Sequence, residues 1–155
     1  MKYPIGIQSF ERIIEDGYVY VDKTHLIYDL THSGSIYFLS RPRRFGKSLL
    51  VSTLENYYLG RKELFKGLAM EKLEKEWNVH PVFHVDFNGA NFTKEGVLET
   101  MLEDYVNKWE KQYGLHTNRE LETGLRFRDV LKSAHEQMGH RAVVLIDEYD
   151  KPILD

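Results

Sequence analysis

The sequence predicts an α/β fold with a parallel sheet, and three observations support this. Short apolar runs typical of buried strands lie at Ile36–Ser40, Pro81–Phe87 and Ala142–Asp147. Segments with helical periodicity separate these runs, and strands that alternate with helices need the crossover connections of a parallel sheet. Polar residues follow the first and third runs, at Arg41–Ser48 and Asp147–Glu148. Open α/β sheets bind ligands at the carboxyl ends of their strands, so this placement favours the same fold class.

Composition places the chain among ordinary globular proteins. It has 155 residues, 42% hydrophobic and 29% charged, which is enough for one domain with a hydrophobic core. The absence of cysteine excludes disulfides and thiolate metal sites. No apolar run approaches the ~20 residues that span a bilayer, and the first residues do not resemble a secretory signal. We therefore expect a cytoplasmic protein that does not associate with a membrane.

The first 35 residues predict two short helices around a strand. Ser9 is suited to cap a helix that ends at Gly17. The run Tyr18–Val21 is typical of a short strand, and Asp22 then caps a helix over Lys23–His32. An alternative is that residues 18–24 form the adenine side of a nucleotide site.

Three longer helices are predicted after the strand at 36–40. The first spans Gly46–Gly60, with apolar residues at helical spacing: Leu49, Leu50, Leu54 and Tyr57. The other two are amphipathic and cover Thr93–Tyr113 and about Asn118–Met138. They separate the second strand from the third.

The stretch Arg41–Ser48 has most of a phosphate-binding loop. Gly46 allows close backbone approach at a helix start, Lys47 supplies a charge for phosphate, and the Ser48 hydroxyl suits Mg²⁺. Arg41 occupies the position where the usual pattern has its first glycine. We predict nucleotide contacts from seven consecutive residues: Arg43, Arg44, Phe45, Gly46, Lys47, Ser48 and Leu49.

The third strand delivers two carboxylates that complete such a site. Asp147 is predicted to bind Mg²⁺ together with Ser48, and Glu148 to act as general base on an attacking water. Lys47 and Glu148 are therefore the predicted catalytic residues. Asp86 ends the second strand and is expected near the same edge. A glutamate directly after the aspartate favours an ATPase over a small GTP switch.

Three separated blocks carry a resemblance to a known family. "YPIGIQSFERIIEDGYVYVDKT", "FLSRPRRFGKSLL" and "LIDEYDKPI" together resemble a bacterial family of predicted AAA-ATPase-like proteins. The resemblance implies a P-loop NTPase-like core of three αβα layers, with ATP and Mg²⁺ as cofactors. It also implies that Arg41 is a family trait, and that a domain similar to PD-(D/E)xK nucleases often follows.

The resemblance also implies a domain organisation. P-loop ATPases of this kind have the strand order 5-1-4-3-2, so Pro81–Phe87 becomes strand 2 and Ala142–Asp147 strand 3. Residues 1–34 are then an N-terminal extension, and residues 35–155 are part of one P-loop domain, truncated after its third core strand. Sheet edges left without a neighbour predict self-association.

Three functional hypotheses remain open from the sequence. The first is Mg-ATP binding with hydrolysis in the full-length protein, which drives or switches an attached effector, the 155-residue chain itself being weak or inactive. The second is a regulatory module that binds nucleotide without hydrolysis. The third is nucleic-acid binding through the basic cluster Arg41–Lys47, since the net charge of −3 leaves positive charge only locally.

Overall fold

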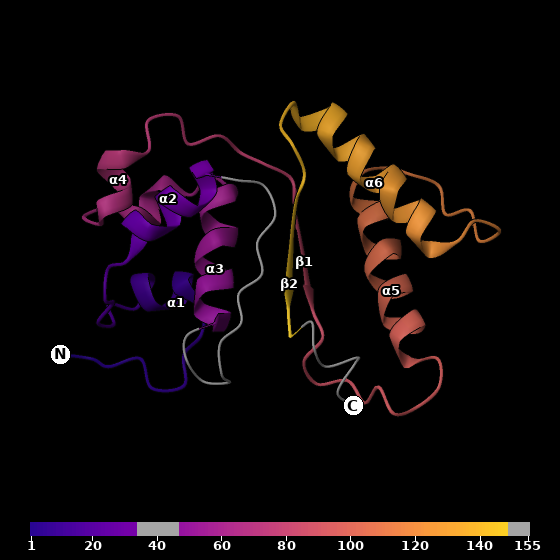
Figure 1. Ribbon diagram of the computed structural model, residues 1–155, viewed down its shortest axis with the longest axis horizontal. Coiled ribbons are helices and arrows are strands. Elements are labelled where there is room, and N and C mark those ends of the chain that lie inside the picture. Colours follow the sequence, from indigo (N-terminus) through magenta and orange to yellow (C-terminus); the bar gives the residue numbers. More distant parts are fainter. Residues whose placement is uncertain (34–46, 149–155) are drawn as a thin grey trace. The chain divides into compact units, whose positions relative to one another are not determined.

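The computed structural model describes residues 1–33 and 47–148 of the chain. These residues belong to two compact units, Met1–Val79 and His80–Asp155, whose helices and strands are labelled in Figure 1. Each unit has its own hydrophobic core. The predicted strand Ile36–Ser40 and the loop residues Arg41–Gly46 lie outside the described residues. Within the described ranges, no helix has both the length and the apolar character to cross a bilayer.

The first unit is helical. Its elements are α1 (Phe10–Glu15), α2 (Thr24–Ser33), α3 (Lys47–Tyr58), the 3-10 helix η1 (Lys62–Phe65) and α4 (Ala69–Leu73). They pack around a cluster of buried side chains: Phe10, Ile27, Leu64, Phe65 and Met70. The predicted helices at 9–17, 23–32 and 46–60 are confirmed by α1, α2 and α3.

The predicted strand at Tyr18–Val21 is wrong. This segment has no regular secondary structure, and Val19 donates one backbone hydrogen bond, to the carbonyl of Lys2 at 2.7 Å. The ring of Tyr20 packs edge-on against Phe10 at 5.2 Å between centroids. Its aromatic side chains therefore serve the core of a helical unit, where a strand would require a partner for its backbone.

Helix α3 buries polar side chains as well as its apolar stripe. The predicted residues Leu49, Leu50, Leu54 and Tyr57 pack against the core cluster. The most buried side chains of the helix, however, are Thr53 and Asn56. Thr53 Oγ1 donates to the Leu49 carbonyl at 2.7 Å, and Asn56 Nδ2 to the Ser52 carbonyl at 2.8 Å. Burial costs these groups little because the helix backbone accepts their hydrogen bonds.

Asp22 and Thr24 cap two helices at once. Asp22 Oδ1 accepts hydrogen bonds from the Thr24 amide at 3.0 Å and the Thr24 hydroxyl at 2.7 Å, at the start of α2. Asp22 Oδ2 accepts from the Ala69 amide at 2.7 Å, and Thr24 Oγ1 from the Met70 amide at 3.0 Å, at the start of α4. The predicted capping role of Asp22 is confirmed, and it extends to a helix 47 residues away.

We expect Asp22→Asn to destabilise the protein at neutral pH and to destabilise it less in acid. Burial disfavours the charged form, but hydrogen bonds from Thr24 and Ala69 outweigh it and lower the pKa of Asp22 below its ordinary value of 3.8. A lowered folded pKa gives stability above the ordinary pKa that is lost as the pH falls through the folded pKa. Asparagine keeps one acceptor, so the free energy of unfolding should fall by about 1–2 kcal/mol at pH 7.

Urea unfolding at pH 7 and pH 3 measures this loss of stability. The exposed control Asp29→Asn should change neither value, and an equal deficit at both pH values would contradict the linkage.

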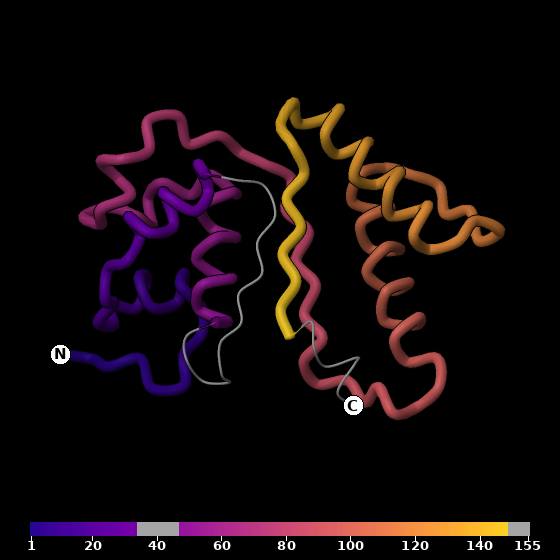
Figure 2. The backbone as a smooth tube through the Cα atoms, viewed as in Figure 1, coloured from indigo at the N-terminus to yellow at the C-terminus, as the bar shows by residue number. Residues whose placement is uncertain are grey.

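The second unit is a two-stranded sheet covered on one face by two helices. Strand β1 (Val82–Asp86) is followed by α5 (Val97–Gln112), α6 (Thr123–Met138) and β2 (Val143–Asp147). The strands are parallel and pair from Val82↔Val143 to Asp86↔Asp147. Figures 1 and 2 show both helices on the same side of the strand pair. The predicted α/β class and the parallel pairing of these two strands are confirmed.

Alternation along β1 directs its apolar residues to the helices. Phe83 and Val85 are buried, whereas Val82, His84 and Asp86 are half-buried. The buried residues join Phe87 against the inner sides of α5 and α6, in a cluster completed by Val106, Trp109, Val130 and Ala134. Both helices begin later than predicted. Helix α5 starts at Val97, since Gly96 at its N-cap has a φ of 77°, which helical residues cannot adopt.

Candidate functional site

The described part of the predicted phosphate loop is its helical end. Lys47 and Ser48 are the first two residues of α3, so the prediction that Gly46-Lys47-Ser48 opens a helix is confirmed from Lys47 onward. Leu49 follows in the first turn and packs against the core of its unit. The remaining predicted nucleotide contacts, Arg43, Arg44, Phe45 and Gly46, lie outside the described residues, as does Arg41.

Helix α3 is fixed within its unit by a specific polar contact. Ser52, one turn beyond Ser48, accepts a hydrogen bond on Oγ from the Phe10 amide at 2.9 Å, where α1 begins. The apolar stripe of α3 packs on the same unit's core. The amino end of a 12-residue helix carries a partial positive charge and amide groups without intrahelical acceptors. The start of such a helix favours an anion, and Lys47 and Ser48 are the first two residues of α3.

The second part of the predicted site is the carboxyl end of β2. The Asp147 side chain is 4% exposed, and its Oδ1 accepts the amide of Glu148 at 3.0 Å. The Asp147 carbonyl accepts the amide of Phe87 at 3.2 Å, which ties the strand end to β1. A carboxylate held in this way has a fixed position at the edge of the sheet.

Glu148 has an unusual backbone conformation. Its φ is 57°, in the left-handed region that glycine adopts freely and other residues adopt at a cost of roughly 1–2 kcal/mol. Such strain is common where a side chain must be aimed in a particular direction. The turn at Glu148 interrupts the strand alternation directly after Asp147.

Asp86 lies opposite Asp147 in the strand pair. Its hydrogen bonds go elsewhere: Oδ1 accepts the Asn88 amide at 2.8 Å, and the Asp86 amide donates to the Tyr105 hydroxyl at 3.1 Å. The expectation that Asp86 lies at the same sheet edge as Asp147 is confirmed. The described hydrogen bonds of Asp86 do not run to Asp147.

The carboxylate oxygens at the carboxyl ends of β1 and β2 are of the kind that binds Mg²⁺. Carboxylates are hard ligands, and Mg²⁺ is held in proteins by one or two of them, with waters and substrate phosphates in its other positions. Across residues 1–33 and 47–148, no three His, Asp or Glu side chains gather into a metal site. This donor set fits a cation shared with a phosphate ligand. Lys47 and Ser48 belong to the first unit and Asp147 and Glu148 to the second.

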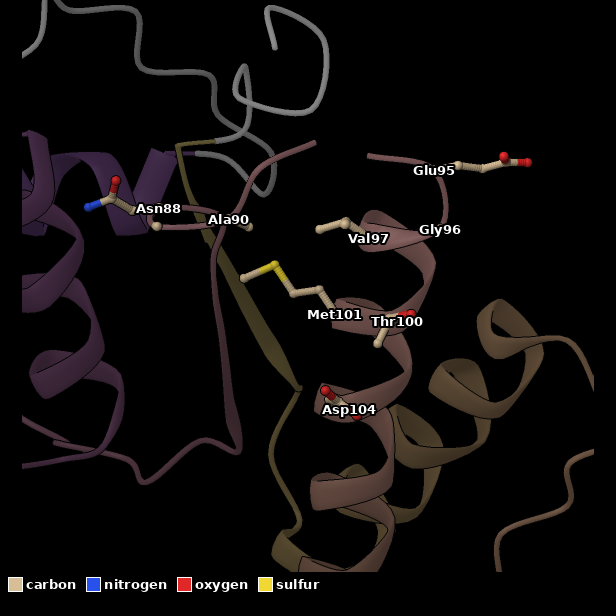
Figure 3. Close-up of a pocket in the computed structure, with 9 residues that line it drawn as sticks. Asn88, Ala90, Glu95, Gly96, Val97, Thr100, Met101 and Asp104 are labelled. Carbon is tan, nitrogen blue, oxygen red and sulfur yellow. The ribbon is translucent and has the colours of Figure 1, made fainter. Parts of the chain in front are cut away.

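A shallow pocket of about 470 Å³ lies beside the carboxyl end of β1 (Figure 3). The turn after β1 and the first two turns of α5 form it. Met101 and Val97 contribute apolar surface to the pocket, and Asp104 and Glu95 contribute carboxylates. The other lining residues are Asn88, Gly89, Ala90, Gly96 and Thr100. No motif in the sequence predicts this pocket. In the sequence, Gly89 and Gly96 belong to this segment, and both have a positive φ in the structure.

Comparison with known proteins gives a family and a relative. The sequence pattern of a family described as "Predicted AAA-ATPase" (AAA-ATPase-like) matches residues 4–155. A curated protein of Azotobacter chroococcum mcd 1, described as "Uncharacterized protein in vnfD 5'region", is 43% identical over 155 residues. The match covers 99% of this chain but 30% of the relative's length. No solved structure matches the chain.

Proposed function

This chain belongs to the AAA-ATPase-like family of predicted AAA-ATPases, and we propose on that basis that it binds Mg-ATP and, within a longer protein, hydrolyses it. The observation that carries the proposal is the start of α3 at Lys47-Ser48, within the family match. Family membership implies nucleotide use, and the helix start supplies a phosphate-binding end. The proposal includes a P-loop NTPase-like core of which both units are parts.

Each predicted site residue has a role in this proposal. The amides of residues 43–49 and the Lys47 ammonium hold the phosphates, and the Ser48 hydroxyl and Asp147 carboxylate hold Mg²⁺. When bound, Mg²⁺ neutralises charge on the β- and γ-phosphates. Glu148, turned away from the strand by its positive φ, accepts a proton from the attacking water. Burial of Asp147 keeps its carboxylate in one position for this purpose.

The proposal extends to what the ATPase serves. The curated relative is much longer than this chain, so we propose that further chain contains an effector that ATP binding or hydrolysis switches. We propose that unpaired sheet edges support self-association. We also propose that the basic cluster Arg41–Lys47 binds nucleic acid in a full-length protein. The proposals of self-association and nucleic-acid binding rest on the sequence pattern alone.

Lys47→Ala tests the proposal most directly. Mg-ATP at about 100 times its dissociation constant stabilises a protein by ~2.7 kcal/mol, which raises the unfolding temperature by roughly 5–10 °C for a domain near this size. We expect this shift in the wild type and its loss in Lys47→Ala, because the variant lacks the charge that meets the phosphates. Thermal unfolding with and without Mg-ATP is the measurement.

The control is Lys66→Ala, because Lys66 is an exposed lysine of the same unit. This variant should retain the shift in unfolding temperature. Equal shifts in wild type and Lys47→Ala would place nucleotide binding elsewhere.

A further inference from the structure

We propose that residues 77–79 form a strap, a segment that closes over the first unit in a strained conformation and is poised to release from it. The strap is the last part of this unit, because Val79 ends the first unit and His80 begins the second. The inference concerns a conformational device of the helical unit and does not depend on nucleotide binding.

Trp77 is the residue that fastens the strap. Its indole ring packs with the core cluster of the first unit, at 5.2 Å between centroids from Phe65 and 5.8 Å from Tyr57. The Tyr57 ring is itself held in place, because its hydroxyl donates a hydrogen bond to the Glu74 carboxylate. Burial of a large aromatic surface therefore favours the closed position of the strap.

Two energetic costs oppose this position, and both fall on Trp77. Its φ is 48°, in the left-handed region that bulky side chains rarely adopt. Its indole Nε1 is buried and has no hydrogen-bond acceptor among residues 1–33 and 47–148. A buried donor without an acceptor has lost the hydrogen bond that water would give it. Release of the strap removes both costs at once, because the backbone then extends and the indole N–H meets water.

Gly60, between α3 and η1, is the seat on which the strap lies. Gly60 has a φ of 72°, and a methyl group at its Cβ position would lie 2.8 Å from Val79 Cγ2 and 3.1 Å from the Trp77 carbonyl oxygen. Only glycine leaves room for the strap to approach this closely. Gly17 has a similar φ of 70°, but no described residue outside its own turn comes within 4 Å of its Cβ position. The close fit at Gly60 is therefore specific to the strap.

These observations describe a closed and a released state that are close in free energy. The closed state has the apolar burial of Trp77, and the released state has a relaxed backbone and a hydrated indole. Local openings of this kind need less free energy than global unfolding. Release adds residues 77–79 to the free chain that joins the two units, about 10 Å when fully extended. The strap thus sets the length of the connection between the units.

Gly60→Ala tests the strap in the full chain. Trp109, the second tryptophan, is replaced by phenylalanine in every sample, so that fluorescence reports Trp77 alone. The alanine methyl group occupies the seat of the strap, so we expect stronger quenching of Trp77 by acrylamide and emission at a longer wavelength. Hydrogen exchange of the α3 amides, measured by mass spectrometry on the same samples, should stay as slow as in the Trp109→Phe parent, because the unit remains folded.

Gly17→Ala is the matched control, because it imposes the same backbone strain where no neighbour is displaced. Its Trp77 quenching should equal that of the parent. Val79→Ala is a second test that keeps Gly60 and removes the side chain packed on it. Val79 is 47% exposed, so this variant should fold, and its Trp77 quenching should also rise.

Two results would overturn the strap. One is unchanged quenching of Trp77 in Gly60→Ala or in Val79→Ala. The other is an increase in quenching that appears only together with faster hydrogen exchange in α3, since the whole helical unit would then be unfolding.

Discussion

Glu148→Gln is expected to abolish ATP turnover while Mg-ATP binding persists. A positioned general base contributes about 10²- to 10⁴-fold to such a reaction, so the rate of phosphate release should fall by that factor. Glutamine keeps the size of the side chain and its hydrogen-bonding capacity, but it cannot accept the proton of the attacking water. Glu148 directly follows the buried Asp147 and turns away from the strand with a φ of 57°.

Phosphate release and thermal stabilisation by Mg-ATP, measured on the same preparations of the longest natural chain, separate chemistry from binding. Glu136→Gln, on an exposed face of α6, is the control and should leave both values unchanged. Loss of binding in Glu148→Gln would mean that the residue holds the ligand. Tight binding of Mg-ATP by the wild type without turnover would favour a non-hydrolysing regulatory module.

Arg126→Met is expected to cost about 3–5 kcal/mol of unfolding free energy, because it leaves a buried carboxylate without its partner. Arg126 on α6 is 3% exposed and so is Glu110 on α5. Arg126 Nη2 donates to Glu110 Oε1 at 2.6 Å and to Asn107 Oδ1 at 2.5 Å, and Nη1 donates to Glu103 at 3.2 Å. The hydrogen bonds that Arg126 donates to Glu110 raise the pKa of the guanidinium, which favours its charged form.

Urea unfolding checks this prediction. The double variant Arg126→Met with Glu110→Leu should recover most of the loss, because replacing both partners of a buried ion pair by apolar side chains is often neutral. Arg128→Met, two residues further along α6 and exposed, should change the stability by less than about 0.5 kcal/mol. A small effect of Arg126→Met, similar to that of Arg128→Met, would mean that water reaches Glu110.

Much of this fold follows from short-range patterns. Ser9 and Asp22 have the chemistry of N-caps, and both cap helices. The apolar runs Pro81–Phe87 and Ala142–Asp147 predict two parallel strands, which the structure pairs over Val82–Asp86 and Val143–Asp147. The acids at the ends of these strands predict a site at the carboxyl end of the sheet, and the strand register places Asp86 opposite Asp147 there. Each of these features depends on neighbours within a few residues, or on a period that the sequence displays directly.

What the sequence by itself determined was the order and type of the main elements and the residue types that suit a phosphate and a cation. The tertiary structure alone decided which distant groups are partners. Tyr18–Val21 has the composition of a strand, yet it packs on a helical core because it lacks a strand neighbour among the described residues. Asp22 caps α4 across 47 residues, and Arg126 is buried because three side chains of α5 surround its guanidinium. The reason is physical: backbone and ionic groups must be satisfied wherever they are buried, and burial depends on packing between segments that local periodicity does not specify.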